Sequence, residues 1–142
     1  MKIEMKNGLG FIAGIKIDHV IAGFAGRHEF PDCSNFIFEN EIANVNNFIE
    51  IETKCLIFLK ELFKDATYHG VWQVCIDEDD PSGQTDAYNL VGKNKLGTLA
   101  IYVSGLTQVT ISIVNACRTL GIIPILLHYD RDCGMYVPQF VI

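Results

Sequence analysis

Side chains that could perform chemistry are concentrated in two short stretches of this chain. The first is a run of four acids, Asp77, Glu78, Asp79 and Asp80, which Asp86 follows. Clustered carboxylates bind Mg²⁺ or Ca²⁺ where their oxygens converge, and otherwise they form an acidic surface that attracts basic partners. The run therefore allows three interpretations: a cation site, a docking surface for a basic protein, or a solvated acidic loop.

The spacing within the acidic run copies part of a calcium-binding EF-hand loop. The twelfth position of that loop supplies a bidentate glutamate, but here this position is Asn89. A predicted strand also precedes the run, where an EF-hand has a helix. We therefore favour a docking surface over a calcium site, and we predict no bound metal ion and no cofactor.

The second stretch runs from His128 to Cys133 and contains Asp130 and Asp132. On a strand, His128 and Asp130 point to the same face, so the imidazole could act as a general base and Cys133 as a nucleophile. His69 could join this group from a neighbouring turn. The same residues also fit a hairpin turn, because Asp favours Asx turns and the next residue is a glycine. No recognised nucleophile motif accompanies them, so a turn is the favoured interpretation.

The composition predicts one folded domain with a sizeable core. The chain has 142 residues, of which 49% are hydrophobic. A chain of this length and composition buries enough apolar surface to fold without disulfides or structural metals. We therefore predict a single domain over residues 1–142.

The charge balance indicates which partners are compatible with the surface. Seventeen Asp and Glu residues against eleven Lys and Arg residues give a net charge of −6 at pH 7. Nucleic-acid backbones are bound by clustered Lys and Arg, so we expect no nucleic-acid partner. A basic protein is the partner that this charge favours.

The cysteines and the N-terminal residues predict a reduced, cytoplasmic protein. The five cysteines are an odd number, and no Cys-x-x-Cys pair occurs among them. Met1–Asn7 alternates in charge and lacks the apolar stretch of a signal peptide. The uncharged stretch Leu96–Cys117 has about the length of a membrane span, but its Gly, Ser, Thr, Gln and Asn residues favour a strand, a turn and a helix. We therefore expect no membrane contact.

Two helices are predicted from apolar residues that recur every three to four positions. The first covers Asn47–Ala66, and its residues Asn47 and Glu50 have the spacing of a capping box. The second covers Leu106–Leu120, is largely apolar, and ends at Gly121.

Strands are predicted where apolar residues alternate or run continuously between turn-forming residues. An extended segment over Phe11–Phe24 is interrupted at Asp18–His19, which indicates a hairpin or a bent strand. Further strands are expected over Phe36–Glu39, Val71–Asp77, Thr98–Val103, Ile123–Tyr129 and Met135–Val141. Pro138 places the last of these at a sheet edge. The segment Glu78–Lys95 is expected to be a long polar loop.

The order of these elements predicts the fold. From Phe36 to Tyr129 the order is strand, helix, strand, strand, helix, strand, which is typical of the split βαβ, ferredoxin-like arrangement. We therefore predict an α+β two-layer sandwich with two helices on one face of a mostly antiparallel sheet, plus an N-terminal hairpin and a C-terminal edge strand. In this fold the acidic run would lie at the opposite end of the sheet from Asp130, and His69 would share the end that holds Asp130.

Three functions from different classes are compatible with these features. The favoured one is a small cytoplasmic binding protein, most concretely an inhibitor or immunity-type protein that neutralises a basic toxin or nuclease through its acidic surface. The second is a small hydrolase or transferase that uses the His128–Cys133 stretch. The third is a ligand- or metal-sensing module, suggested by fold analogy. Exposed sheet edges also allow a homodimer. Trp72 is expected in the core, but it would anchor an interface if it faced outward.

Overall fold

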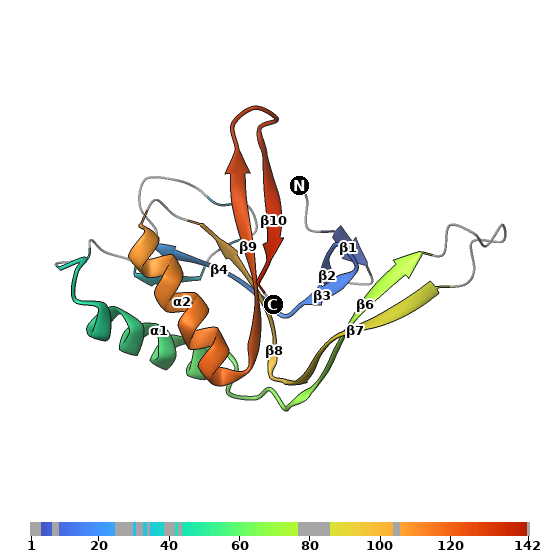
Figure 1. The fold of residues 1–142 in the computed structure, drawn as a ribbon, viewed down its shortest axis with the longest axis horizontal. Coiled ribbons are helices and arrows are strands. Elements are labelled where there is room, and N and C mark those ends of the chain that lie inside the picture. Colours follow the sequence, from blue (N-terminus) through green and yellow to red (C-terminus); the bar gives the residue numbers. More distant parts are fainter. Residues whose placement is uncertain are drawn as a thin grey trace.

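The structure is a computed structural model that describes residues 4–6, 9–24, 30, 33, 35–38, 42, 44–76, 86–103 and 106–141. Within these residues the chain forms ten strands, arranged in two five-stranded sheets, and two helices (Figure 1). We call the sheet with the order β10-β9-β8-β4-β5 the central sheet, and the sheet with the order β1-β2-β3-β6-β7 the outer sheet.

The central sheet is built from the most apolar segments of the chain. Its strands are β4 (His19–Phe24), β5 (Phe36–Phe38), β8 (Gly97–Tyr102), β9 (Ile122–Asp130) and β10 (Met135–Phe140). The neighbours β5, β4, β8 and β9 run parallel, and β10 pairs antiparallel with β9 at the edge. All six residues of β8 are buried, as expected for a parallel strand that is covered on both faces. The predicted edge position of the Pro138 strand is confirmed.

Both helices cover one face of the central sheet (Figure 1). Helix α1 (Phe48–Leu62) begins at Asn47, whose side chain accepts a hydrogen bond from the Glu50 amide. Helix α2 (Thr107–Leu120) ends at Gly121, which has a φ of +78°. The residues Ile51, Cys55 and Leu59 of α1 pack into the core beneath it. The α+β class, with two helices on one face of a sheet, is therefore as predicted.

The outer sheet packs against the other face of the central sheet. It contains β1 (Glu4–Lys6), β2 (Leu9–Ile12), β3 (Ile15–Ile17), β6 (His69–Ile76) and β7 (Asp86–Lys95). A second apolar cluster joins Ile12, Ile15 and Val71 of this sheet to Ala100 and Ile125 of the central sheet. The N-terminal hairpin is β2–β3, which turns at Ala13–Gly14 and not at the predicted Asp18–His19. The break at Asp18–His19 is instead where the chain leaves the outer sheet and enters the central sheet.

Strand β7 corrects the prediction of a long polar loop over residues 78–95. Asp86–Lys95 pairs antiparallel with β6 over most of its length, from Ile76 opposite Asp86 to His69 opposite Lys95. The pairing is interrupted by two register shifts near Val71, and Asn94 has a φ of +51°. Hydrogen bonding and packing on β6 outweigh the low strand propensity of Asn and Gly in this segment.

The ferredoxin-like arrangement is not found. In that fold the four strands between Phe36 and Tyr129 would share one sheet, but β6 belongs to the outer sheet and β5, β8 and β9 belong to the central one. The unit β8–α2–β9 joins adjacent parallel strands through a helix. Apolar periodicity identifies strands but does not show which strands pair, and this is why the predicted topology was wrong.

Neither α1 nor α2 has the length and apolar character that a membrane crossing requires, and these are the helices found in the described part of the chain.

Candidate functional site

The β6–β7 pair presents an exposed apolar face, which we call the ribbon face. It consists of Trp72, Val74, Tyr88 and Leu90. Trp72 lies opposite Leu90, and Val74 lies opposite Tyr88. Directly paired residues share a face of a sheet, as do residues two positions apart on a strand, so these four side chains lie together.

The ribbon face is exposed to solvent, while the opposite face is packed against the core at Val71. Trp72 is 52% exposed, Tyr88 61% and Leu90 39%, whereas Val71 on the other face is 6% exposed and belongs to the core between the sheets. Neighbouring exposed aromatic and aliphatic side chains are typical of a protein-binding surface. Trp72 therefore faces outward, contrary to the expectation that it lies in the core.

The acidic residues predicted from the sequence belong to the connection of this ribbon. Asp77, Glu78, Asp79 and Asp80 lie outside the described residues, and Asp86 is the first residue of β7, opposite Ile76. The chain order therefore places the acidic run between the paired ends of β6 and β7, next in sequence to the strands that carry the ribbon face.

The second predicted group forms a tight turn between β9 and β10. The Asp132 amide donates to Asp130 Oδ1 at 2.9 Å, and the Gly134 amide donates to the Asp130 carbonyl at 2.8 Å. Gly134 has a φ of +67°, which a glycine adopts without strain. The hydrogen bond from Asp132 lowers the pKa of Asp130 below its ordinary value. These contacts are those of the Asx turn that the sequence favoured.

The contacts of His128 and Cys133 do not form a nucleophile and base pair. The Nε2 atom of His128 lies 2.7 Å from Oε1 of Gln139, and the sulfur of Cys133 lies 3.9 Å from the carbonyl oxygen of Asp130. Nucleophilic catalysis by a thiol requires a base within hydrogen-bond reach of that thiol. The Cys133 side chain shares a hydrogen bond with the Asp130 carboxylate, whose lowered pKa makes it a weak base. All of these side chains except the intermediate Asp130 are exposed. This turn therefore contributes no observation in favour of the hydrolase or transferase hypothesis.

His69 does not lie near this turn, which corrects the predicted placement. It pairs with Lys95, and the amide of the adjacent Leu96 donates to the carbonyl of Gly121, immediately before β9 begins. Asp130 is at the other end of β9, roughly 25 Å away for nine residues of strand. The prediction assumed that β6 and β9 share one sheet, and they do not.

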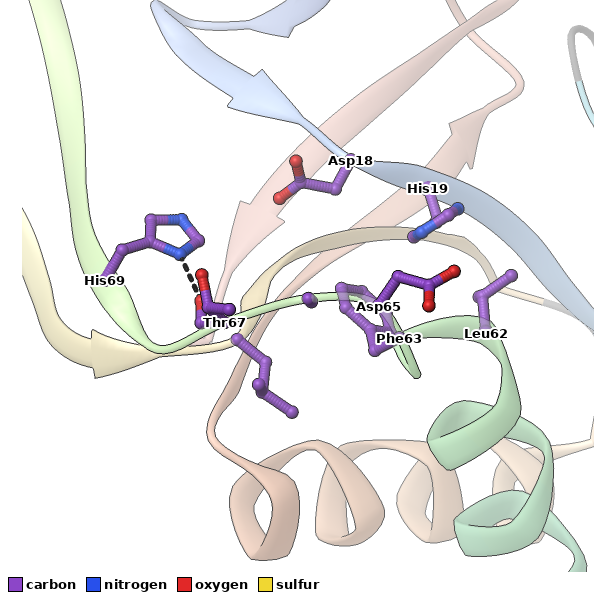
Figure 2. Close-up of a pocket in the computed structure, with 9 residues that line it drawn as sticks. Asp18, His19, Leu62, Phe63, Asp65, Thr67 and His69 are labelled. Atoms are coloured by element: carbon purple, nitrogen blue, oxygen red, sulfur yellow. Dashed lines mark hydrogen bonds between the residues drawn. The ribbon is translucent and has the colours of Figure 1, made fainter.

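His69 instead lines a cleft that the sequence did not indicate. The cleft has a volume of about 400 Å³ and lies between the end of α1, the β3–β4 junction and the starts of β6 and β8 (Figure 2). Its apolar side chains are Leu62, Phe63, Ala66 and Leu96, and its polar side chains are Asp18, His19, Asp65, Thr67 and His69. This volume is within the range of pockets that bind small molecules.

Each histidine in the cleft has a defined contact. His69 Nδ1 lies 2.8 Å from the carbonyl oxygen of Thr67, so Nδ1 carries the proton, because a carbonyl can only accept. The ring of His19 packs edge-on against Phe63, with 4.8 Å between the centroids. Burial lowers the pKa of His19, and the charge of Asp18 opposes part of that shift. The neutral form of His19 is therefore favoured at pH 7.

Asp18 is held by one of its two carboxylate oxygens. Its Oδ2 atom accepts from the Thr98 amide at 2.8 Å, while Oδ1 has a contact of 3.9 Å with Nζ of Lys16. In Figure 2 the carboxylate of Asp18 and the ring of His69 point toward the same space. The cleft therefore retains acceptor atoms that are available to a bound molecule.

Sequence reasoning missed the cleft because its residues are distant in sequence and come together only through the strand pairing. The break at Asp18–His19 was visible, but nothing linked it to the segment from Leu62 to His69. The ribbon face was missed in part because Tyr88 and Leu90 were assigned to a loop, although their alternation with Asn89 is a strand signal.

No three His, Cys, Asp or Glu side chains are positioned to hold a metal ion within the ranges that the structure describes. Comparison of the chain with protein-family models, with curated proteins and with solved structures found no match.

Proposed function

We propose that this chain is a cytoplasmic binding protein that neutralises a basic protein, and that it contacts this partner through the ribbon face and the adjacent acidic run. The observation that carries the proposal is the exposure of Trp72, Tyr88 and Leu90 side by side on the β6–β7 ribbon. Such residues are costly to leave in water and are frequent in the energetically dominant part of interfaces.

The two parts of this surface have different roles in the proposal. The apolar side chains provide affinity, because water leaves Trp72 and its neighbours when a partner covers them. The acidic run and the net charge of −6 attract a basic partner and accelerate its association. An inhibitor or immunity-type protein that covers the cationic active site of a toxin or nuclease is the most concrete form of this function.

The proposal is tested by affinity purification from the host lysate with three baits. The baits are the unmodified chain, Trp72→Ala, and Tyr129→Ala as a matched control. Tyr129 is 57% exposed, close to the 52% of Trp72, but it lies on the β9–β10 hairpin of the central sheet. We expect a single basic protein to be recovered by the unmodified chain and by Tyr129→Ala, and to be lost with Trp72→Ala or at raised salt.

Truncation of an anchoring aromatic side chain costs about 2 kcal/mol or more of binding free energy, which corresponds to about a thirtyfold loss of affinity. Recovery of the partner in equal amounts with Trp72→Ala, or equal loss with Tyr129→Ala, would contradict the role of the ribbon face. Recovery that does not depend on salt would contradict the role of the acidic run.

A further inference from the structure

The cleft of about 400 Å³ beside α1 is acidic. Its charged side chains are the carboxylates of Asp18 and Asp65, and none of the residues that line it is Lys or Arg. Lys16 contacts Asp18 only at 3.9 Å and with a largely exposed side chain. Lys64, next to Asp65, is paired with Glu61 at 2.9 Å. Lys95 lies opposite His69 in the β6–β7 pairing but is not one of the lining residues. The lining of the cleft itself therefore carries negative charge.

The end of helix α1 adds to this negative charge independently of the carboxylates. Leu62 is the last residue of the helix, and Phe63 is its C-cap; both line the cleft. The C-terminus of a helix carries the negative end of the helix dipole, equivalent to roughly half an elementary charge. Cations are stabilised at this position.

The remaining polar atoms accept hydrogen bonds. In the tautomer set by the hydrogen bond from Nδ1 to the Thr67 carbonyl, the Nε2 atom of His69 is an acceptor. Oδ1 of Asp18 and the carboxylate of Asp65 are also acceptors. A molecule that fits these atoms must carry several donors and a positive charge, together with an apolar part that contacts Phe63, Leu62 and Leu96.

We propose that this cleft binds a small organic cation: an ammonium or guanidinium group on a short alkyl stem. An organic cation fits better than a metal ion, because the described residues offer no group of three His, Cys, Asp or Glu side chains that could coordinate one. The charged group lies beside the Asp18 carboxylate and the His69 ring, which point toward the same space (Figure 2), and the stem lies against Leu62 and Leu96. This site is separate from the ribbon face and does not depend on the function proposed for it.

The test is an NMR titration of the uniformly ¹⁵N-labelled chain with n-butylammonium and n-butylguanidinium. Butyrate and n-butanol, which have the same stem with a negative charge or no charge, are the controls. We expect saturable shifts of the amides of residues 62–69 and 96, with a dissociation constant on the order of 1 mM for the cations. The two controls should produce no saturable shifts.

Two variants separate the cleft from a general effect of charge. Asp65→Asn removes a carboxylate that lines the cleft, and Asp132→Asn removes an exposed one on the β9–β10 turn, outside the cleft. We expect Asp65→Asn to weaken binding of the cations about threefold to fivefold and Asp132→Asn to leave it unchanged.

Each of three results would overturn this inference. The first is no saturable shift with either cation, and the second is equal binding of butyrate or butanol, which would assign the interaction to the apolar side chains alone. The third is equal weakening by the two variants, which would indicate general attraction to an acidic protein. None of these measurements involves the ribbon face, so the result is independent of the affinity purification.

Discussion

Asp18 and Thr98 are 80 positions apart in the sequence and bind each other through reciprocal hydrogen bonds. The Asp18 amide donates to Thr98 Oγ1 at 3.2 Å, and the Thr98 amide donates to Asp18 Oδ2 at 2.8 Å. The Thr98 hydroxyl also lies 2.5 Å from the Lys16 carbonyl oxygen. These contacts fix the point where the chain passes from the outer sheet to the central sheet, and they position Asp18 at the cleft.

Replacement of the Thr98 hydroxyl should destabilise the chain. Thr98→Val keeps the branched shape but removes the donor to Lys16 and an acceptor of the Asp18 amide, at a buried position. We expect the free energy of unfolding to fall by about 1–2 kcal/mol, as measured by urea denaturation. The control is Thr119→Val, whose hydroxyl donates to the Asn115 carbonyl on exposed helix surface, and which should change stability by less than about 0.5 kcal/mol. Equal effects would contradict the role given to Thr98.

Gly97 should not tolerate a side chain. Its φ is +154°, and an added Cβ would lie 2.5 Å from Asp18 Oδ2 and 3.0 Å from Phe63 Cε1. We expect Gly97→Ala to lower the free energy of unfolding by about 2–3 kcal/mol in urea denaturation. Gly134→Ala separates steric conflict from backbone strain, because Gly134 has a φ of +67° but no atom within 4 Å of an added Cβ. It should cost only about 1 kcal/mol.

Charge reversal in the acidic run should slow partner binding. We expect Asp79→Lys combined with Asp80→Lys to reduce the association rate with the recovered basic protein about tenfold at low salt, because attraction between opposite charges accelerates encounter. The control variant combines Glu61→Lys with Asp132→Lys, which makes the same change in net charge elsewhere on the surface. Stopped-flow fluorescence of Trp72 would follow both reactions. An equal reduction in the two variants would assign the effect to net charge and not to the acidic run.

The two buried thiols should make the fold sensitive to alkaline pH. Burial raises the pKa of Cys55 and of Cys117 to about 12, from an ordinary value of 9.0. Above pH 9 the unfolded state releases these thiol protons while the folded state still retains them. The free energy of unfolding is therefore unaffected below pH 9 and falls as the pH rises from 9 toward 12. The loss reaches at most about 1.4 kcal/mol per pH unit for each thiol.

Unfolding experiments between pH 8 and 11 on the unmodified chain and on Cys55→Ala with Cys117→Ala would measure this effect. The double variant should be less stable at pH 8 because its core contains a cavity, but its stability should decline less steeply. Iodoacetamide provides a second measurement, since the exposed Cys133 should react in the folded state while Cys55 and Cys117 should react only after unfolding. An identical pH slope in the two proteins would contradict the interpretation.

Local features of this fold could be predicted from the sequence, and long-range features could not. Asn47 and Gly121 were assigned their positions at helix ends because caps depend on residues three or four positions away. The break at Asp18 and the edge position of Pro138 have equally local causes. The pairing of β4 with β8 depends on residues 80 positions apart, and no periodicity contains that information.

The same distinction between local and long-range features applies to the candidate sites. The Asx turn at Asp130 was favoured from five consecutive residues, and the structure contains it. The ribbon face requires that Trp72 be paired with Leu90, and the cleft requires that the β3–β4 junction lie beside the segment from Leu62 to His69. A signal for parallel pairing was present in the uninterrupted apolar strands at Thr98–Val103 and Ile123–Tyr129, because strands buried on both faces occur mainly in parallel sheets.

The position of β4 between β5 and β8 also determines the order in which the chain can fold during synthesis. Strand β4 is complete at Phe24, but its neighbour β8 ends at Tyr102, and β9, which lies on the other side of β8, ends at Asp130. The ribosome must therefore release most of the chain before the central sheet can form, and until then the apolar residues of β4 lack their neighbours on the β8 side. Folding that depends on contacts so distant in sequence is slow, and the early strands are the segments that most require protection from aggregation while synthesis continues.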